Sequence, residues 1–133
     1  MAGLNVWPFR RKPPLHVAIN TGSGQPVLLL HGIASSHVTY DNVVKHLPDR
    51  HRVAAFDLLG FGQSSAPATA QFTLDEHVEA VVTTLARIKM PTPVTIVGHS
   101  LGALISIRLA AKHPKLVKHL IIVAPPVYVP SST

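Results

Sequence analysis

The segment Gly98-His99-Ser100-Leu101-Gly102 has the residue types and the spacing of a nucleophilic site. A serine hydroxyl can attack a carbonyl carbon when a sharp turn between a strand and a helix exposes it beside free backbone N–H groups. Such a turn needs small residues two positions before and after the serine, because neighbouring backbone comes close there. Gly98 and Gly102 meet this requirement, so the segment predicts that Ser100 is a nucleophile.

The residues on either side of this segment match the surroundings that a nucleophilic serine needs. Val94–Val97 predicts a buried strand, and Leu101–Lys112 predicts a helix that is apolar on nearly every side. The pattern Gly-x-Ser-x-Gly by itself also occurs in ordinary turns. Placed between a strand and a helix, it favours a nucleophile elbow, the strained turn that exposes a reactive serine.

The rest of the chain alternates between segments of strand and helix character. Short apolar or β-branched segments predict strands, and apolar residues at helical spacing predict helices. Strands are predicted over residues 16–20, 27–30, 52–56, 94–97 and 120–123, and helices over about 39–47, 73–89 and 101–112. Strands that alternate with helices indicate an α/β fold, with a mostly parallel sheet and helices on both of its faces.

Three motifs, each expected directly after a strand, resemble those of the α/β-hydrolase fold family. They are His31-Gly32-Ile33, the segment Asp57-Leu58-Leu59-Gly60-Phe61-Gly62-Gln63-Ser64, and the elbow Gly98–Gly102. Their order and spacing are those of the family, and the resemblance covers about residues 16–128. It implies a serine hydrolase of the esterase or lipase-like kind, of which this chain resembles the N-terminal half.

The resemblance also implies roles for individual residues. Ser100 becomes the nucleophile in acyl transfer from a small ester or acyl substrate, and the backbone N–H groups of Ile33 and Leu101 become the oxyanion hole. From the residue types alone, His31 could serve as a base and Asp57 as the acid of a triad. In the resembling family both positions shape their loops, so we expect structural roles for His31, Gly32 and Asp57.

A catalytic histidine and its carboxylate are the parts that this sequence does not supply. The family places the acid and then the histidine after the serine, but the last acidic residue of this chain is Glu79, and His113 and His119 are the histidines after Ser100. His113 lies beyond a helix of about 12 residues, roughly 18 Å from the elbow at 1.5 Å per residue. We therefore expect no triad acid and no triad base in this chain.

These observations predict an incomplete hydrolase domain. We expect residues 1–15 to be a basic N-terminal tail and residues 16–133 to be the N-terminal part of an α/β-hydrolase domain without its lid and its C-terminal strands. Residues 120–123 would then form an exposed apolar edge strand. A truncated hydrolase that is inactive alone is one interpretation. The alternative is a non-catalytic remnant that binds a complementing chain, or a second copy, through this edge.

Composition excludes several other classes of function. The chain has 133 residues, a formal net charge of +6 and no cysteine, and 47% of its residues are hydrophobic. Its basic residues are not interleaved with aromatic residues, so we expect no nucleic-acid partner. No ligand spacing predicts a metal or an organic cofactor. Because Arg10–Lys12 follow an apolar segment, the reverse of a secretory signal, we expect a cytoplasmic protein whose tail is solvated rather than bound to a membrane.

Overall fold

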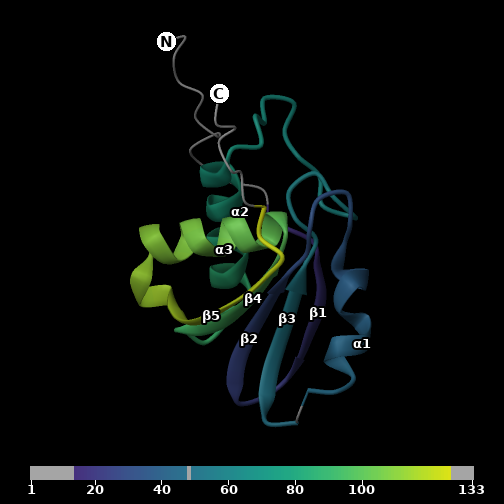
Figure 1. Ribbon diagram of the computed structural model, residues 1–133, viewed down its shortest axis with the longest axis vertical. Helices are drawn as coiled ribbons and strands as arrows, with labels where there is room; N and C mark the ends of the chain where they lie inside the picture. Colours follow the sequence, from purple (N-terminus) through teal and green to yellow (C-terminus); the bar gives the residue numbers. More distant parts are fainter. Residues whose placement is uncertain (1–13, 48, 127–133) are drawn as a thin grey trace, which may run out of the picture.

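A single five-stranded sheet organises the protein. The computed structural model describes residues 14–47 and 49–126, and its strands lie in the order β1-β3-β2-β4-β5 (Figure 1). They are β1 (Val17–Gly22), β2 (Gln25–Leu30), β3 (His51–Phe56), β4 (Val94–His99) and β5 (Val117–Val123). Strands β2 to β5 are parallel, and β1 is antiparallel to β3. The predicted α/β fold with a mostly parallel sheet is therefore confirmed.

The central strands are the most apolar and the most deeply buried. Val27–Leu30 of β2 and Val53–Phe56 of β3 are buried on both faces of the sheet, as expected for parallel strands that helices cover. Strand β5 begins at Val117, three residues before the predicted start at Leu120. The chain leaves the short 3-10 helix η2 (Pro114–Leu116) there, and Val117 already pairs with Val94 of β4.

Two α-helices cover one face of the sheet (Figure 1). They are α2 (Leu74–Arg87) and α3 (Leu101–Lys112), which pack with β2, β3 and β4 around the larger apolar core. Helix α2 begins as predicted, because the Thr73 hydroxyl accepts a hydrogen bond from the Glu76 N–H at 3.1 Å. The Glu76 carboxylate accepts from the Gln71 N–H at 2.9 Å, which further fixes the chain just before the helix.

The other face carries two short helices in place of the predicted helix over 39–47. A 3-10 helix η1 (His37–Tyr40) continues into one turn of α-helix, α1 (Asp41–Val44). Tyr40 is buried, and Val44 and Leu47 pack on the smaller core, but the Val43 side chain is 44% exposed. Segments of this length depend on tertiary packing for stability. The Tyr40 hydroxyl, whose pKa burial raises to about 12, anchors the segment by donating to the Leu30 carbonyl at 2.8 Å.

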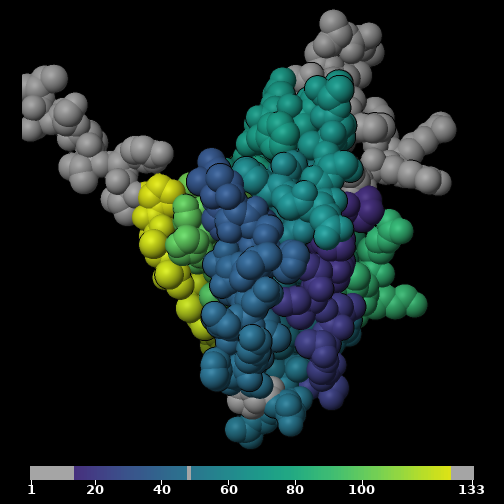
Figure 2. Space-filling view, turned by 90° about the vertical axis from the view of Figure 1, so that its right-hand side faces the viewer, coloured from purple at the N-terminus to yellow at the C-terminus, as the bar shows by residue number. Residues whose placement is uncertain are grey.

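Strand β5 lies at one edge of the described sheet. Figure 2 shows the face that carries α1, with β5 in yellow at its margin and not covered by α1. The side chains of Ile121 and Val123 are 50% and 45% exposed on this strand. An apolar edge strand is therefore present among the described residues, where residues 120–123 predicted one.

Two sequence predictions concern segments that the structure does not describe. The basic cluster Arg10–Lys12 of the predicted tail, and the residues from Val127 onward at the end of the predicted hydrolase part, lie outside residues 14–47 and 49–126. Within those ranges, no helix combines the length and the apolar character that crossing a membrane requires. The cytoplasmic location stays a prediction.

Candidate active site

The three motifs singled out in the sequence come together at one end of the sheet. Strands β2, β3 and β4 run parallel, so their carboxyl ends meet at the same edge, at the top of the sheet in Figure 1. His31 follows β2, Asp57 follows β3 and Ser100 follows β4. Ligands of open α/β sheets bind beyond the carboxyl ends of the strands. This end of the sheet is therefore the candidate active site.

Ser100 occupies a strained turn between β4 and α3. Its φ of 54° and ψ of −116° lie in a region that residues other than glycine rarely adopt. The Ser100 N–H donates to the Val123 carbonyl at 3.0 Å, and the Ser100 carbonyl accepts from the Ala103 N–H at 3.0 Å. Bonds on both sides hold the backbone in this conformation. Observed strain of this kind is typical of functional sites.

Gly98 and Gly102 let the turn pack against neighbouring backbone. A Cβ on Gly98 would lie 2.5 Å from the Gly102 carbonyl oxygen and 2.6 Å from the Ser106 Oγ. A Cβ on Gly102 would lie 2.3 Å from the carbonyl oxygen of Leu30 at the end of β2. Both positions therefore require glycine, because a side chain at Gly98 would push β4 away from α3 and one at Gly102 would push α3 away from the end of β2.

Backbone groups surround the Ser100 side chain. A Cβ on Gly32 would lie 3.1 Å from the Ser100 Cβ, so the loop after β2 passes directly beside the serine, and Ile33 is its next residue. Leu101 is the first residue of α3, so its N–H has no partner within the helix. The two N–H groups predicted as the oxyanion hole thus belong to segments on two sides of Ser100. Their role in catalysis stays a prediction.

His31 joins two loops of the site. Its side chain is fully buried, its Nδ1 donates to the Gly32 carbonyl at 2.7 Å, and its Nε2 accepts from the Leu58 N–H at 2.8 Å. These partners require the neutral ring with the proton on Nδ1, and burial lowers the pKa of His31. Both ring nitrogens are used, so the geometry does not favour His31 as a general base.

Asp57 is the buried carboxylate of the site. Its Oδ1 accepts from the His37 N–H at 2.8 Å and its Oδ2 from the Gln63 N–H at 3.1 Å. Burial alone would raise the pKa of Asp57, but these bonds and the His37 ring lower it, so the carboxylate is charged at neutral pH. A Cβ on Gly62, whose φ is +53°, would overlap the carboxylate. Asp57 thus holds together the loops that follow β2 and β3.

His37 is a site residue that sequence reasoning missed. Its Nδ1 lies 2.8 Å from the Asp57 Oδ1, and its ring is 24% exposed. No motif links two residues 20 positions apart, so the pair becomes visible only after folding. A histidine bonded to a carboxylate resembles the base of a triad. However, β3 is two strands away from β4, about 10 Å at 4.8 Å per strand, so His37 is not placed as the base for Ser100.

The histidines that follow Ser100 in the sequence lie far from it. His113 caps the distal end of α3, with its Nε2 3.8 Å from the Glu79 Oε1. His119 pairs with Thr95, near the start of β4, whereas Ser100 follows its end. Within residues 14–47 and 49–126, no histidine ring is hydrogen-bonded to the Ser100 hydroxyl. In this part of the chain the serine has a prepared turn and no base.

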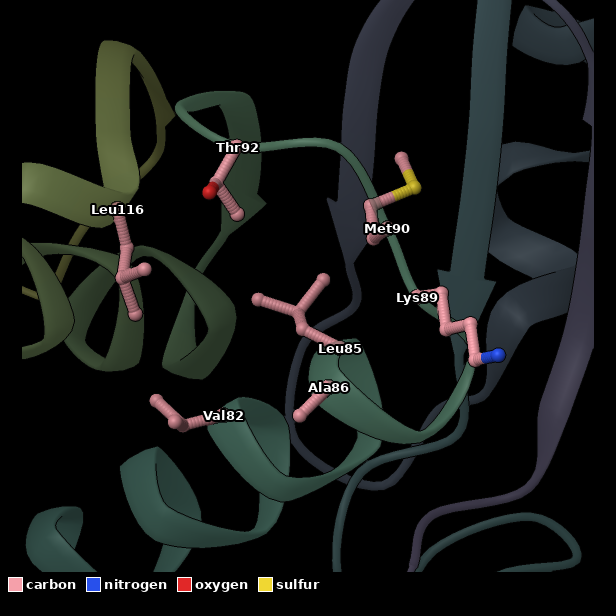
Figure 3. A pocket seen from close by; sticks show the side chains of 7 residues that line it. All are labelled: Val82, Leu85, Ala86, Lys89, Met90, Thr92 and Leu116. Atoms are coloured by element: carbon pink, nitrogen blue, oxygen red, sulfur yellow. The ribbon is translucent and has the colours of Figure 1, made fainter.

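One apolar cavity lies at the other end of the sheet. Its volume is about 240 Å³, and Leu85, Ala86 and Leu116 are among the residues that line it (Figure 3). It adjoins the connection from α2 to β4, so the length of β4, about 20 Å for six residues, separates it from Ser100. In the described part of the chain, no three His, Cys, Asp or Glu side chains are grouped to hold a metal ion.

We expect the protein to lose stability as the pH falls from about 6.5 towards 5. Burial lowers the pKa of His77, which is 2% exposed and whose Nδ1 has no hydrogen-bond partner among the described residues. Burial also lowers the pKa of His31. A histidine with a lowered folded pKa contributes fully above its unfolded value near 6.5, and this contribution is lost as the pH falls below it. The folded pKa of Asp57 is also lowered, so its contribution to stability is lost only when the pH falls below about 4.

Urea unfolding at pH 7.5, 6.5 and 5.5 measures this effect. The variant His77→Leu should show a smaller difference between the free energies of unfolding at pH 7.5 and 5.5 than the wild type. The variant His46→Ala, which changes an exposed histidine, should keep the wild-type difference. A pH dependence that is identical in all three proteins would contradict the assignment to His77.

Comparison with known proteins agrees with this geometry. Residues 25–133 match the family described as alpha/beta hydrolase fold. The Arabidopsis thaliana protein named Probable lysophospholipase BODYGUARD 4 is 35% identical over 137 residues, which cover 95% of this chain and 33% of that protein. A marine microorganism esterase has a TM-score of 0.78 and 27% identity, covering 90% of this chain and 46% of its own. An esterase from Exiguobacterium antarcticum has a TM-score of 0.73 and 28% identity, and the match covers 81% of this chain and 40% of the esterase.

The match extends over most of this chain but over a smaller part of its relatives. The chain spans 33% of the length of BODYGUARD 4 and 22% of the length of BODYGUARD 3. The sequence match, the sheet order and the elbow between β4 and α3 all point to the same fold. The chain belongs to the α/β-hydrolase fold family.

Proposed function

We propose that the protein is a serine hydrolase that acts on carboxylic esters or related acyl substrates, with Ser100 as its nucleophile. The observation that carries this proposal is the backbone of Ser100, which is held at a φ of 54° between β4 and α3 and packed against β2 through Gly102. Strain persists where the surrounding structure maintains it and function uses it. The esterases and the probable lysophospholipase among the relatives support carboxylic esters as the proposed substrate class.

In the proposed reaction, the Ser100 Oγ forms a bond to the acyl carbon while its proton passes to a histidine base. The carbonyl oxygen becomes an oxyanion, which the N–H groups of Ile33 and Leu101 stabilise. The bond to the leaving alcohol then breaks, the alcohol takes the proton, and water hydrolyses the acyl-enzyme. Because no described histidine is bonded to Ser100, the proposal requires a histidine and an acid from further polypeptide, of the same protein or of a partner.

Covalent labelling tests the proposal directly. A fluorophosphonate forms a stable bond with an activated serine. In the presence of the polypeptide that supplies the histidine and the acid, intact mass spectrometry should therefore show one adduct on the wild type and none on Ser100→Ala. Peptide mapping should place the adduct on Ser100. A series of p-nitrophenyl esters with acyl chains of increasing length then reports the substrate class. Labelling that persists in Ser100→Ala would contradict the assignment of the nucleophile.

The β5 edge favours a second candidate function, association with another polypeptide. Ile121 and Val123 expose about half of their side chains on a strand that pairs on one side with β4, among the described residues. Exposed strand edges are templates for pairing with another chain. The partner would be a second copy or a complementing chain.

Analytical ultracentrifugation tests this association. If β5 mediates it, Ile121→Lys should shift the sedimentation of the protein towards the monomer. The matched variant Ile107→Lys changes an exposed isoleucine on α3 and should have no such effect. A wild type that remains monomeric at all concentrations, and that gains no partner, would argue against this second function.

A further inference from the structure

The loop that carries Ile33 is attached to two consecutive residues after β3, by its start to Leu58 and by its end to Asp57. At its start, His31 accepts a hydrogen bond from the Leu58 N–H at 2.8 Å. At its end, the N–H and the Nδ1 of His37 both contact the Asp57 Oδ1 at 2.8 Å. Asp57 and Leu58 directly follow β3, so residues 31–37 form a bridge between the ends of β2 and β3.

The other described hydrogen bonds of this loop join its last residues to η1: Ser35 Oγ lies 2.6 Å from Thr39 Oγ1, and the Ser36 carbonyl accepts from the Thr39 N–H at 3.2 Å. The Ile33 side chain is 67% exposed, and Ala34 has a φ of 55°, a conformation that favours glycine. The loop also passes beside the nucleophile, since a Cβ on Gly32 would lie 3.1 Å from the Ser100 Cβ. The position of the Ile33 N–H relative to Ser100 therefore depends on the two attachments to the end of β3, together with the bonds that join Ser35 and Ser36 to η1.

The attachment at His37 is suited to hold the loop firmly. The Asp57 carboxylate is fully buried, and hydrogen bonds to a charged, buried acceptor are stronger than neutral ones. The other titratable groups near the His37 ring are His16, at 6.3 Å between ring centroids, and His31. In the tautomer that is bonded to Asp57, the His37 Nδ1 carries the proton and donates it to the carboxylate.

From this geometry we propose that His37 is a positioning residue, which sets the place of the Ile33 N–H relative to Ser100 by tying the end of its loop to Asp57. The expected effect of His37 on hydrolysis rests on the proposed function. The attachment of the loop itself does not depend on that function. A displaced N–H donor stabilises the oxyanion less, and errors of about 1 Å in such sites can reduce the rate about 100-fold.

Two substitutions at His37 distinguish a role in positioning the Ile33 N–H from a role in folding alone. His37→Ala removes the ring donor, whereas His37→Asn places an amide N–H close to the position of the lost Nδ1. The matched control His46→Ala changes an exposed histidine beyond α1. With kcat normalised to the sites that a fluorophosphonate titrates, we expect about a 10- to 100-fold fall in His37→Ala, with KM changed less than about threefold. His37→Asn should recover most of the loss, and His46→Ala should match the wild type.

Hydrogen exchange gives a readout that is independent of activity. In His37→Ala the amides of residues 33–36 should exchange faster than in the wild type, while those of α2 and β4 should not change, and His37→Asn should restore the slow exchange. Unchanged exchange over 33–36 in His37→Ala would overturn the inference, whether or not hydrolysis is detected. If amide exchange in His37→Ala rises equally over the whole protein, and kcat per titrated site equals that of the wild type, the inference would also be overturned. A wild type that Ser100→Ala does not impair rejects the proposed function instead.

Discussion

Replacing Ser100 with alanine is expected to lower the kcat/KM of ester hydrolysis by about 10³-fold or more while the protein stays folded. The nucleophile and its base act as a unit, so loss of the oxygen removes the covalent route and leaves the contribution of the oxyanion site. The Ser100 hydroxyl makes no hydrogen bond to another residue in the described ranges. Its removal should therefore change the free energy of unfolding by less than about 0.5 kcal/mol.

The variant Ser100→Gly is the matched control for the strain in the elbow. It should lose hydrolysis to the same extent, but glycine adopts a φ of 54° without steric cost, so unfolding should require about 1 kcal/mol more than for Ser100→Ala. Steady-state kinetics and urea unfolding measure the two effects. Hydrolysis that survives in both variants would refute the role of Ser100, and equal stability of the two would refute the stored strain.

Replacing Gly102 with alanine should produce the largest loss of stability. Alanine normally stabilises a helix by about 1 kcal/mol relative to glycine. Here its Cβ would lie 2.3 Å from the Leu30 carbonyl oxygen and 2.6 Å from that of His31, and neither backbone atom can move without displacing the end of β2. We expect a loss of about 3 kcal/mol or more, which is enough to unfold a large fraction of a marginally stable protein.

Circular dichroism during urea unfolding measures this loss. The substitution Ile107→Ala, on the exposed side of the same helix, should change the free energy of unfolding by less than about 0.5 kcal/mol. The contrast separates a contact of α3 with β2 from a general sensitivity of the helix. A Gly102→Ala variant as stable as the wild type would mean that the helix does not approach β2 as closely as described.

The sequence by itself determined most strands and helices, and the tight turn at Ser100. Apolar runs such as Val27–Leu30 mark buried strands, and glycines two positions either side of Ser100 mark a tight turn, because both patterns follow from local backbone geometry and side-chain periodicity. The mostly parallel sheet followed from the alternation of strands and helices. The form of the segment 39–47 was not predictable in this way, since packing of Tyr40 and Leu47 against the sheet decides it.

The tertiary structure decided which distant residues meet. Asp57 was recognised within its motif, but its partner His37 was not, and the joint attachment of residues 31–37 to the end of β3 could not be read from spacing. It also decided that β1 lies antiparallel beside β3. Local patterns reflect interactions between residues a few positions apart. Contacts between strands depend on their order in the sheet, which the free energy of the whole packed chain determines.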